Sequence, residues 1–148
     1  MKVLIVYGTK YGNTKKVGEL IAEGINTVEG NEVTIENVKD FDVNKENTFD
    51  LILIGSPNQM GAHISSVKKF IKNLSKAPLK VSAYAAFDTY MSKDFEKAVK
   101  KIEKQISKTM PDLKKASPGL SIKVGGMKGP IVEEDLTKCK DFGINLIK

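Results

Sequence analysis

The chain contains no arginine, and it has one cysteine and one histidine among its 148 residues. Without arginine, no guanidinium group can bind a phosphate through paired hydrogen bonds. The lone Cys139 cannot form an intrachain disulfide, which is typical of proteins in a reducing compartment. The lone His63 excludes a histidine cluster as a metal site.

Long hydrophobic runs are also missing. No apolar stretch is long enough to span a bilayer, and none follows a charged start as a signal peptide would. No linker rich in serine, proline or glycine divides the chain, whose length suffices for one core. We therefore expect a single cytoplasmic domain over residues 1–148, with no membrane partner. The net charge is +6, but no aromatic–basic platform accompanies it, so we expect no nucleic-acid partner.

What the sequence does contain is clearest in its first 25 residues. The apolar run 3–7 predicts a strand buried on both faces, which is typical of a parallel sheet. A loop of glycine and hydroxyl residues follows, and apolar residues at spacings of three and four then predict a helix. The first N–H groups of a helix lack internal partners and carry the positive end of its dipole. A strand, a polar loop and a helix start therefore predict a phosphate-binding site.

The loop between this strand and helix reads Thr9-Lys10-Tyr11-Gly12-Asn13-Thr14. It fits neither the Walker-type loop nor the three-glycine dinucleotide motif. It resembles the Thr/Ser-x-x-Gly-Asn-Thr loop of the flavodoxin family, which holds the phosphate of FMN. An ordinary turn whose threonines only cap the helix is the structural alternative.

The rest of the chain continues the alternation of strands and helices. Strands are predicted near residues 32–37, 51–55, 81–86 and 120–124, and helices at 64–74, 95–110 and 136–147. Right-handed crossovers then give a three-layer, doubly wound α/β sheet of five parallel strands. The resemblance to flavodoxins implies the flavodoxin-like order 2-1-3-4-5. In that order a ligand lies where strands 1 and 3 lead away in opposite directions.

Two further loops are expected at the ligand. The loop after the third strand, residues 56–61, resembles the second flavin loop of short flavodoxin-like proteins, and the end of the fourth strand resembles the third. The resemblance implies that these loops hold the FMN ring, with Tyr90 or Phe87 stacked on one of its faces. The ring-binding candidates are Ser56, Pro57, Asn58, Gln59, Met60, Gly61, Phe87, Asp88, Thr89 and Tyr90.

The resemblance implies an FMN-binding electron carrier that passes electrons through a partly exposed flavin and needs no catalytic side chain. Many flavodoxins cover the inner flavin face with tryptophan, which this chain lacks. Members of the family are usually acidic, whereas the excess of lysine here favours redox partners with acidic docking surfaces.

The same residues bear on other functions of this chain. A flavodoxin-like oxidoreductase similar to the protoporphyrinogen oxidases is the alternative, because Gly61-Ala62-His63 resembles their flavin loop. A phosphoacceptor domain of the same strand order needs acidic residues after strands 1 and 3, where this chain has Gly8-Thr9 and Gly55-Ser56. His63 is either a proton donor beside the flavin or an exposed loop residue.

Overall fold

Strands and helices alternate along the chain, as the hydrophobic patterns predict. The computed structural model describes residues 1–126 and 128–148. The strands are β1 (Lys2–Tyr7), β2 (Glu32–Asn37), β3 (Thr48–Pro57), β4 (Lys80–Tyr90), β5 (Lys114–Lys115) and β6 (Leu120–Lys123). The helices are α1 (Asn13–Asn26), α2 (Ser65–Leu74), α3 (Lys97–Thr109) and α4 (Glu133–Ile147).

The strands form one sheet in which every ladder between them is parallel. The order is β2-β1-β3-β4, and both β5 and β6 pair with β4 on its remaining edge. The predicted order is confirmed, with the fifth position shared by two short strands. Pro118 lies between them, and proline cannot donate a hydrogen bond to a strand ladder, which is consistent with the break.

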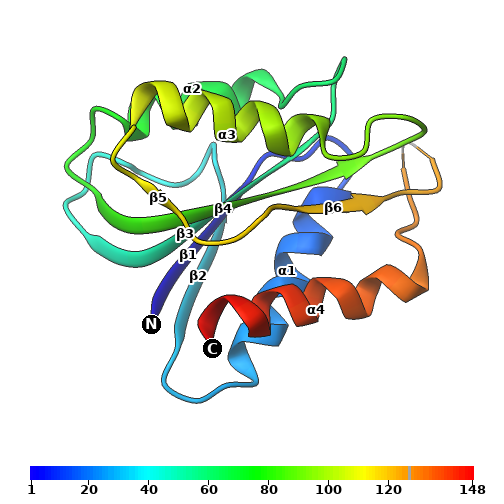
Figure 1. Ribbon diagram of the computed structural model, residues 1–148, viewed down its shortest axis with the longest axis horizontal. Helices are drawn as coiled ribbons and strands as arrows, with labels where there is room; N and C mark the ends of the chain where they lie inside the picture. Colours follow the sequence, from blue (N-terminus) through cyan, green and yellow to red (C-terminus); the bar gives the residue numbers. More distant parts are fainter. Residues whose placement is uncertain (127) are drawn as a thin grey trace.

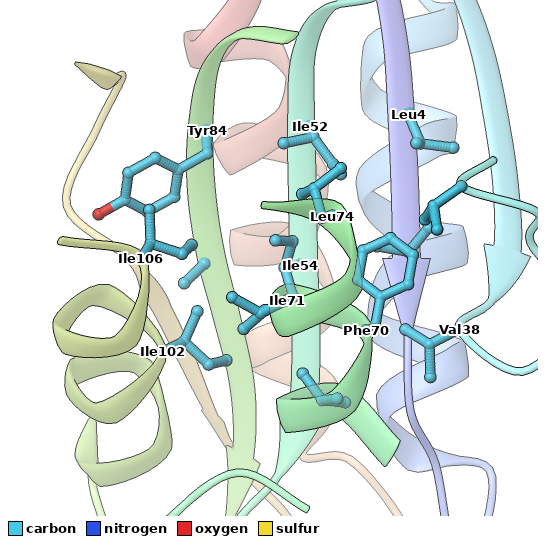
Figure 2. Close-up of a cluster of buried hydrophobic side chains, with 14 of the residues drawn as sticks. Leu4, Val38, Ile52, Ile54, Phe70, Ile71, Leu74, Tyr84, Ile102 and Ile106 are labelled. Carbon is cyan, nitrogen blue, oxygen red and sulfur yellow. The ribbon is translucent and has the colours of Figure 1, made fainter. Parts of the chain in front are cut away.

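Helices cover both faces of the sheet (Figure 1). α2 and α3 cover one face, and α1 and α4 cover the other. Figure 2 shows the core between the sheet and the helices α2 and α3. There Phe70 and Ile71 of α2 and Ile102 of α3 pack onto Ile52 and Ile54 of β3. Because neighbouring strand residues point to opposite faces, the apolar run of β1 supplies both cores.

This arrangement places the loops that follow β1, β3, β4 and β6 at one end of the sheet, because parallel strands end together. β1 and β3 are neighbours, yet α1 and α2, which follow them, lie on opposite faces (Figure 1). A crevice therefore opens between their loops, as expected for a doubly wound sheet. None of the helices in the described ranges is long and apolar enough to cross a membrane.

Candidate functional site

The loop after β1 leads directly into the start of α1. Gly12 is the N-cap residue of this helix, with a left-handed φ of 92°. The Gly12 N–H donates to Thr9 Oγ1 at 2.9 Å, which closes the turn. Because glycine has no side chain, it cannot cap the start of α1 with a side-chain oxygen, and no side-chain cap hydrogen bond is present there. The first turn also has no acidic residue that would repel an anion.

Thr14 connects this loop to β4. Its side chain is buried, and its Oγ1 lies 3.0 Å from Oγ1 of Thr89. A hydroxyl can donate and accept at once, so this pair can present a donor to a nearby anion while staying bonded. Thr14 is therefore not the cap of α1, and its hydroxyl joins the first loop to the third.

Asn58 anchors the loop after β3. Its backbone N–H and its side-chain Nδ2 both donate to the carbonyl of Thr89, at 3.0 and 3.1 Å. Its Oδ1 accepts from the N–H of Ala98 in the first turn of α3, at 2.9 Å. One side chain therefore holds the second loop against both β4 and α3.

Beyond Asn58 the chain forms a tight hairpin. Gln59 and Ala62 exchange backbone hydrogen bonds of 2.8 and 3.1 Å, with Met60 and Gly61 at the tip. Both tip residues have positive φ, 55° and 75°, as a two-residue hairpin turn of this hand requires. The Met60 side chain is 99% exposed.

The loop after β4 supplies an aromatic pair. Tyr90 and Phe95 meet edge to face, with ring centroids 5.4 Å apart and an angle of 73° between the rings. This packing fixes the Tyr90 ring at the end of β4, while Phe95 stays more than half exposed.

These loops surround one pocket at the carboxyl end of the sheet, which we call the carboxyl-end pocket. Its lining residues are Thr9, Lys10, Tyr11, Asn13, Thr14, Pro57, Asn58, Gln59, Ile64, Thr89, Tyr90, Met91, Asp94 and Val124. Ten of them are among the sixteen residues expected from the sequence. Gly12, Met60 and Gly61 are in the same loops but outside the lining.

Three other candidates are buried away from the pocket. The Phe87 ring packs against Gly55 and Gly18 in the core, so it does not supply the aromatic wall expected of it. Ser56 Oγ accepts from the N–H of Ile64 at 3.0 Å and thereby closes the second loop.

Asp88 is the third, and its carboxylate caps the N-terminal end of α3. Its carboxylate accepts from the Val99 N–H at 2.9 Å and from the Ser121 hydroxyl. Burial raises the pKa of Asp88 to about 6, against the lowering effect of these hydrogen bonds. The side chain holds α3 and β6 together behind the pocket wall.

Four lining residues were missed by the sequence analysis. Ile64, Met91 and Asp94 continue the two expected loops by a few residues, so longer loop boundaries would have included them. Val124 follows β6, and its N–H donates to the Tyr90 carbonyl at 2.9 Å. The sequence could have indicated Val124, since every parallel strand of the sheet ends at the carboxyl end where the pocket lies.

His63 turns away from the pocket. Its Nε2 lies 2.6 Å from Oε1 of Gln105 on α3. Since Gln105 Nε2 donates to the Lys68 carbonyl at 2.9 Å, its Oε1 must accept, and His63 Nε2 carries the proton. The imidazole is only 5% exposed, and burial lowers its pKa. It is neither an exposed loop residue nor a wall of the carboxyl-end pocket.

A second hollow lies at the opposite end of the sheet, between the ends of α2 and α3. Its larger volume, about 330 Å³ against about 180 Å³, does not make it the better site. It is lined by the last residue of α2, the segments that follow α2 and α3, and the start of β4. The nearby helix ends are C-terminal, and the negative end of a helix dipole is unfavourable for an anion. The donors for a phosphate are at the carboxyl-end pocket.

Comparisons with known proteins agree with this geometry. The sequence model of the flavodoxin domain family matches residues 4–127 of this chain. A flavodoxin of Aquifex aeolicus is 40% identical over 75 residues. That alignment covers 49% of this chain and 40% of the Aquifex protein.

Solved structures share the fold over nearly the whole chain. A flavodoxin from the domain Archaea has a TM-score of 0.79 at 24% identity, covering 99% of this chain and 96% of its own. Flavodoxin 2 of Bacillus cereus has a TM-score of 0.77 at 23% identity, covering 99% and 98%. With the family match spanning most of the sequence, the chain belongs to the flavodoxin family of FMN-binding electron-transfer proteins.

Proposed function

We propose that this chain is an electron carrier that holds FMN in the carboxyl-end pocket. The FMN phosphate would bind at residues 9–14, and the ring would bind between residues 57–61 and the end of β4. The observation that carries the proposal is the start of α1, where Gly12 leaves the first N–H groups uncapped at the edge of the pocket. When bound, FMN supplies the redox chemistry, because its ring accepts and releases electrons.

The protein's own residues then bind and orient the cofactor. Backbone N–H groups of α1, the Thr14 hydroxyl and the Asn13 amide can bind a phosphate through hydrogen bonds without a guanidinium. Tyr90, held in place by Phe95, offers an aromatic surface at the other end of the pocket. Asn58 keeps the second loop and β4 at a fixed separation, which preserves the width of the ring site.

The proposal is tested by titrating the apoprotein with FMN and with riboflavin, which lacks the phosphate. Thr14→Ala is expected to weaken FMN binding by about tenfold or more, because a hydrogen bond to a charged group contributes about 1.5–3 kcal/mol. Riboflavin binding should change far less.

Thr27→Ala is the matched control. Thr27 is at the other end of α1, where its hydroxyl donates to the Gly24 carbonyl. It should affect both ligands equally and weakly. If Thr14→Ala weakens FMN and riboflavin equally, the phosphate does not bind at this loop.

We infer that a redox partner docks on the apolar side chains at the rim of the pocket. Tyr11, Met60, Met91 and Phe95 are 42%, 99%, 39% and 55% exposed, and they lie in the three loops around the pocket. Because the whole chain carries a net charge of +6, we infer a partner that presents an acidic surface with an apolar centre.

We also propose that residues 1–148 act as one domain in the cytoplasm. The free Cys139 is buried among core residues, and burial raises its pKa to about 12. A thiol of this kind is unreactive and consistent with a reducing compartment.

A further inference from the structure

His63 is a buried polar residue that the proposed binding of FMN does not use. It follows the turn closed by Gln59 and Ala62, which we call the 59–62 hairpin, and it precedes Ile64. Gln59 and Ile64 both line the carboxyl-end pocket. The His63 side chain bonds to α3 instead and is 5% exposed. It can therefore hold the second loop in place without touching a ligand.

The contacts of His63 join this loop to both helices on one face of the sheet. Its Nε2–H donates to Oε1 of Gln105 in α3, with 2.6 Å between the two atoms. Gln105 Nε2 in turn donates to the carbonyl of Lys68 in α2 at 2.9 Å. Because both ends of the Gln105 amide are bonded, its oxygen stays turned toward His63.

The other ring nitrogen decides which charge the imidazole can carry. Nδ1 of His63 is buried and has no hydrogen-bond partner among the described residues. A neutral imidazole tolerates this, whereas an imidazolium has a second N–H that needs an acceptor. The charged groups that act on the ring are two cations, Lys68 of α2 and Lys101 of α3. Burial lowers the pKa of His63 and the two lysines lower it further, against the raising effect of the Gln105 hydrogen bond.

We propose that His63 is a positioning residue for the flavin-ring loop: its neutral imidazole holds the 59–62 hairpin against α3, and protonation releases it. The imidazolium is hydrated only when the side chain leaves its buried place, so the second loop loses its attachment to Gln105 as the pH falls. This inference rests on the proposed FMN site, because it assigns the loop to the flavin ring.

Titration by NMR follows the proton directly, because the chain has one histidine. His63 should titrate below its ordinary pKa of 6.5 in the apoprotein, and lower still with riboflavin bound. A ligand that needs the hairpin in place opposes the proton, and the proton opposes the ligand by the same factor. Riboflavin is the probe, since the phosphate of FMN itself titrates near pH ~6.

Riboflavin affinity, measured by quenching of flavin fluorescence, should fall at acid pH. Between about pH 7.5 and about pH 5.5 the loss should be at least about twofold and at most about tenfold, the limit for a released imidazole of ordinary pKa. His63→Gln retains a donor and cannot be protonated, so it should bind as wild type does at the higher pH and lack this loss. Asp88 also titrates in this range, but both proteins contain it, and its effect cancels in the comparison.

Gln105→Ala removes the acceptor while keeping the imidazole. The freed His63 should then titrate close to 6.5, and riboflavin affinity at about pH 7.5 should fall by about twofold or more. Thr109→Ala is the matched control on α3. The Thr109 hydroxyl donates to the Gln105 backbone carbonyl at 2.9 Å, so its loss leaves the Gln105 amide side chain in place. This variant should change neither the titration of His63 nor the affinity.

Hydrogen exchange of the apoprotein tests the hairpin without a ligand. The Gln59 and Ala62 amides donate to each other's carbonyls, so both are protected while the hairpin is closed. In wild type their protection should decrease between about pH 7.5 and about pH 5.5, by up to about tenfold. In His63→Gln it should stay constant. If that variant does not fold, Gln105→Ala supplies the comparison, with protection already reduced at the higher pH.

Four results would overturn the inference. They are a His63 pKa that riboflavin does not change, pH profiles of riboflavin affinity that run parallel in wild type and His63→Gln, and wild-type hairpin protection that is equal at both pH values. The fourth is a Gln105→Ala protein whose imidazole still titrates well below 6.5, since packing then holds it. The proposed function is judged separately, from the wild-type preference for FMN over riboflavin at neutral pH and from Thr14→Ala.

Discussion

Replacing Asp88 by asparagine is expected to remove a pH-dependent destabilisation of the folded protein. The Asp88 side chain is fully buried at the end of β4, behind the pocket wall. Removal of its carboxylate from water raises the pKa from 3.8 to about 6, and the negative charge of Glu96 adds to the rise. Hydrogen bonds from Ser121 and Val99 lower it in part.

The folded protein and the unfolded chain bind the Asp88 proton with different affinities. A raised pKa means that the folded protein binds this proton better than the unfolded chain does. Stability from this group is therefore greatest below pH 3.8, decreases as the pH rises to about 6, and is constant above that. A rise of just over two pKa units corresponds to about 3 kcal/mol of destabilisation at neutral pH.

Asparagine is suited to the test because it has the same shape and does not titrate. Its Oδ1 can accept from the Val99 N–H, and its Nδ2 can donate to the Ser121 oxygen after the hydroxyl rotates. Urea unfolding of both apoproteins, between about pH 4.5 and about pH 7.5, should show the variant gaining about 2 kcal/mol relative to wild type.

Comparing the two proteins removes contributions that they share, including the titration of His63. Asp40→Asn is the matched control, because Asp40 is exposed in a turn. Its unfolding free energy should track that of wild type across the range. If the Asp88→Asn and wild-type curves run parallel, Asp88 titrates normally and burial does not govern its charge.

Three other outcomes are expected. Gly24→Ala should destabilise the protein by about 1–3 kcal/mol in urea unfolding, because the new Cβ would collide with the Lys140 backbone where α1 crosses α4. Gly18→Ala on the same helix is its control: the Cβ would lie 3.2 Å from the terminal methyl of the Ile35 side chain rather than against backbone, and little stability should be lost. A lowered pKa means that folded protein binds the His63 proton less well than the unfolded chain does, so stability should fall as the pH drops below 6.5; His63→Gln should flatten that decline, and an unchanged slope would contradict this account. Reduction of the FMN-loaded protein by an acidic redox protein, measured by stopped flow, should slow as ionic strength rises. A rate that increases with salt would contradict the inferred charge of the partner.

Local patterns in the sequence were sufficient for the sheet and for the first loop. The apolar run of β1 contains its own evidence for burial on both faces, because every residue of it must avoid water. Residues 9–14 were identifiable as a candidate anion-binding loop, because the N–H groups at a helix start need acceptors. These N–H groups belong to residues that are neighbours in the chain. The order of the strands came from the resemblance to flavodoxins, because right-handed crossovers fix the face on which each helix lies and not the strand order.

The roles of β4 residues were decided by the tertiary structure. Alternation along a strand places Phe87 and Thr89 on one face and Asp88 on the other. This alternation does not show how far along β4 the helix α1 extends. α1 covers Phe87 and leaves Thr89 at the pocket, while α3 begins over Asp88 and takes its carboxylate as a cap. Aromatic and acidic character alone therefore suggested two site residues that packing assigns to the core.

The contact of Thr14 with Thr89 is the clearest case of information absent from the sequence pattern. The two residues are far apart in the chain, and neither periodicity nor turn chemistry relates them. They meet because β1 and β4 both pair with β3, so the start of α1 lies beside the end of β4. The sequence indicated which residues are candidates for binding a phosphate, and the pairing of distant strands decided which side chains lie beside them.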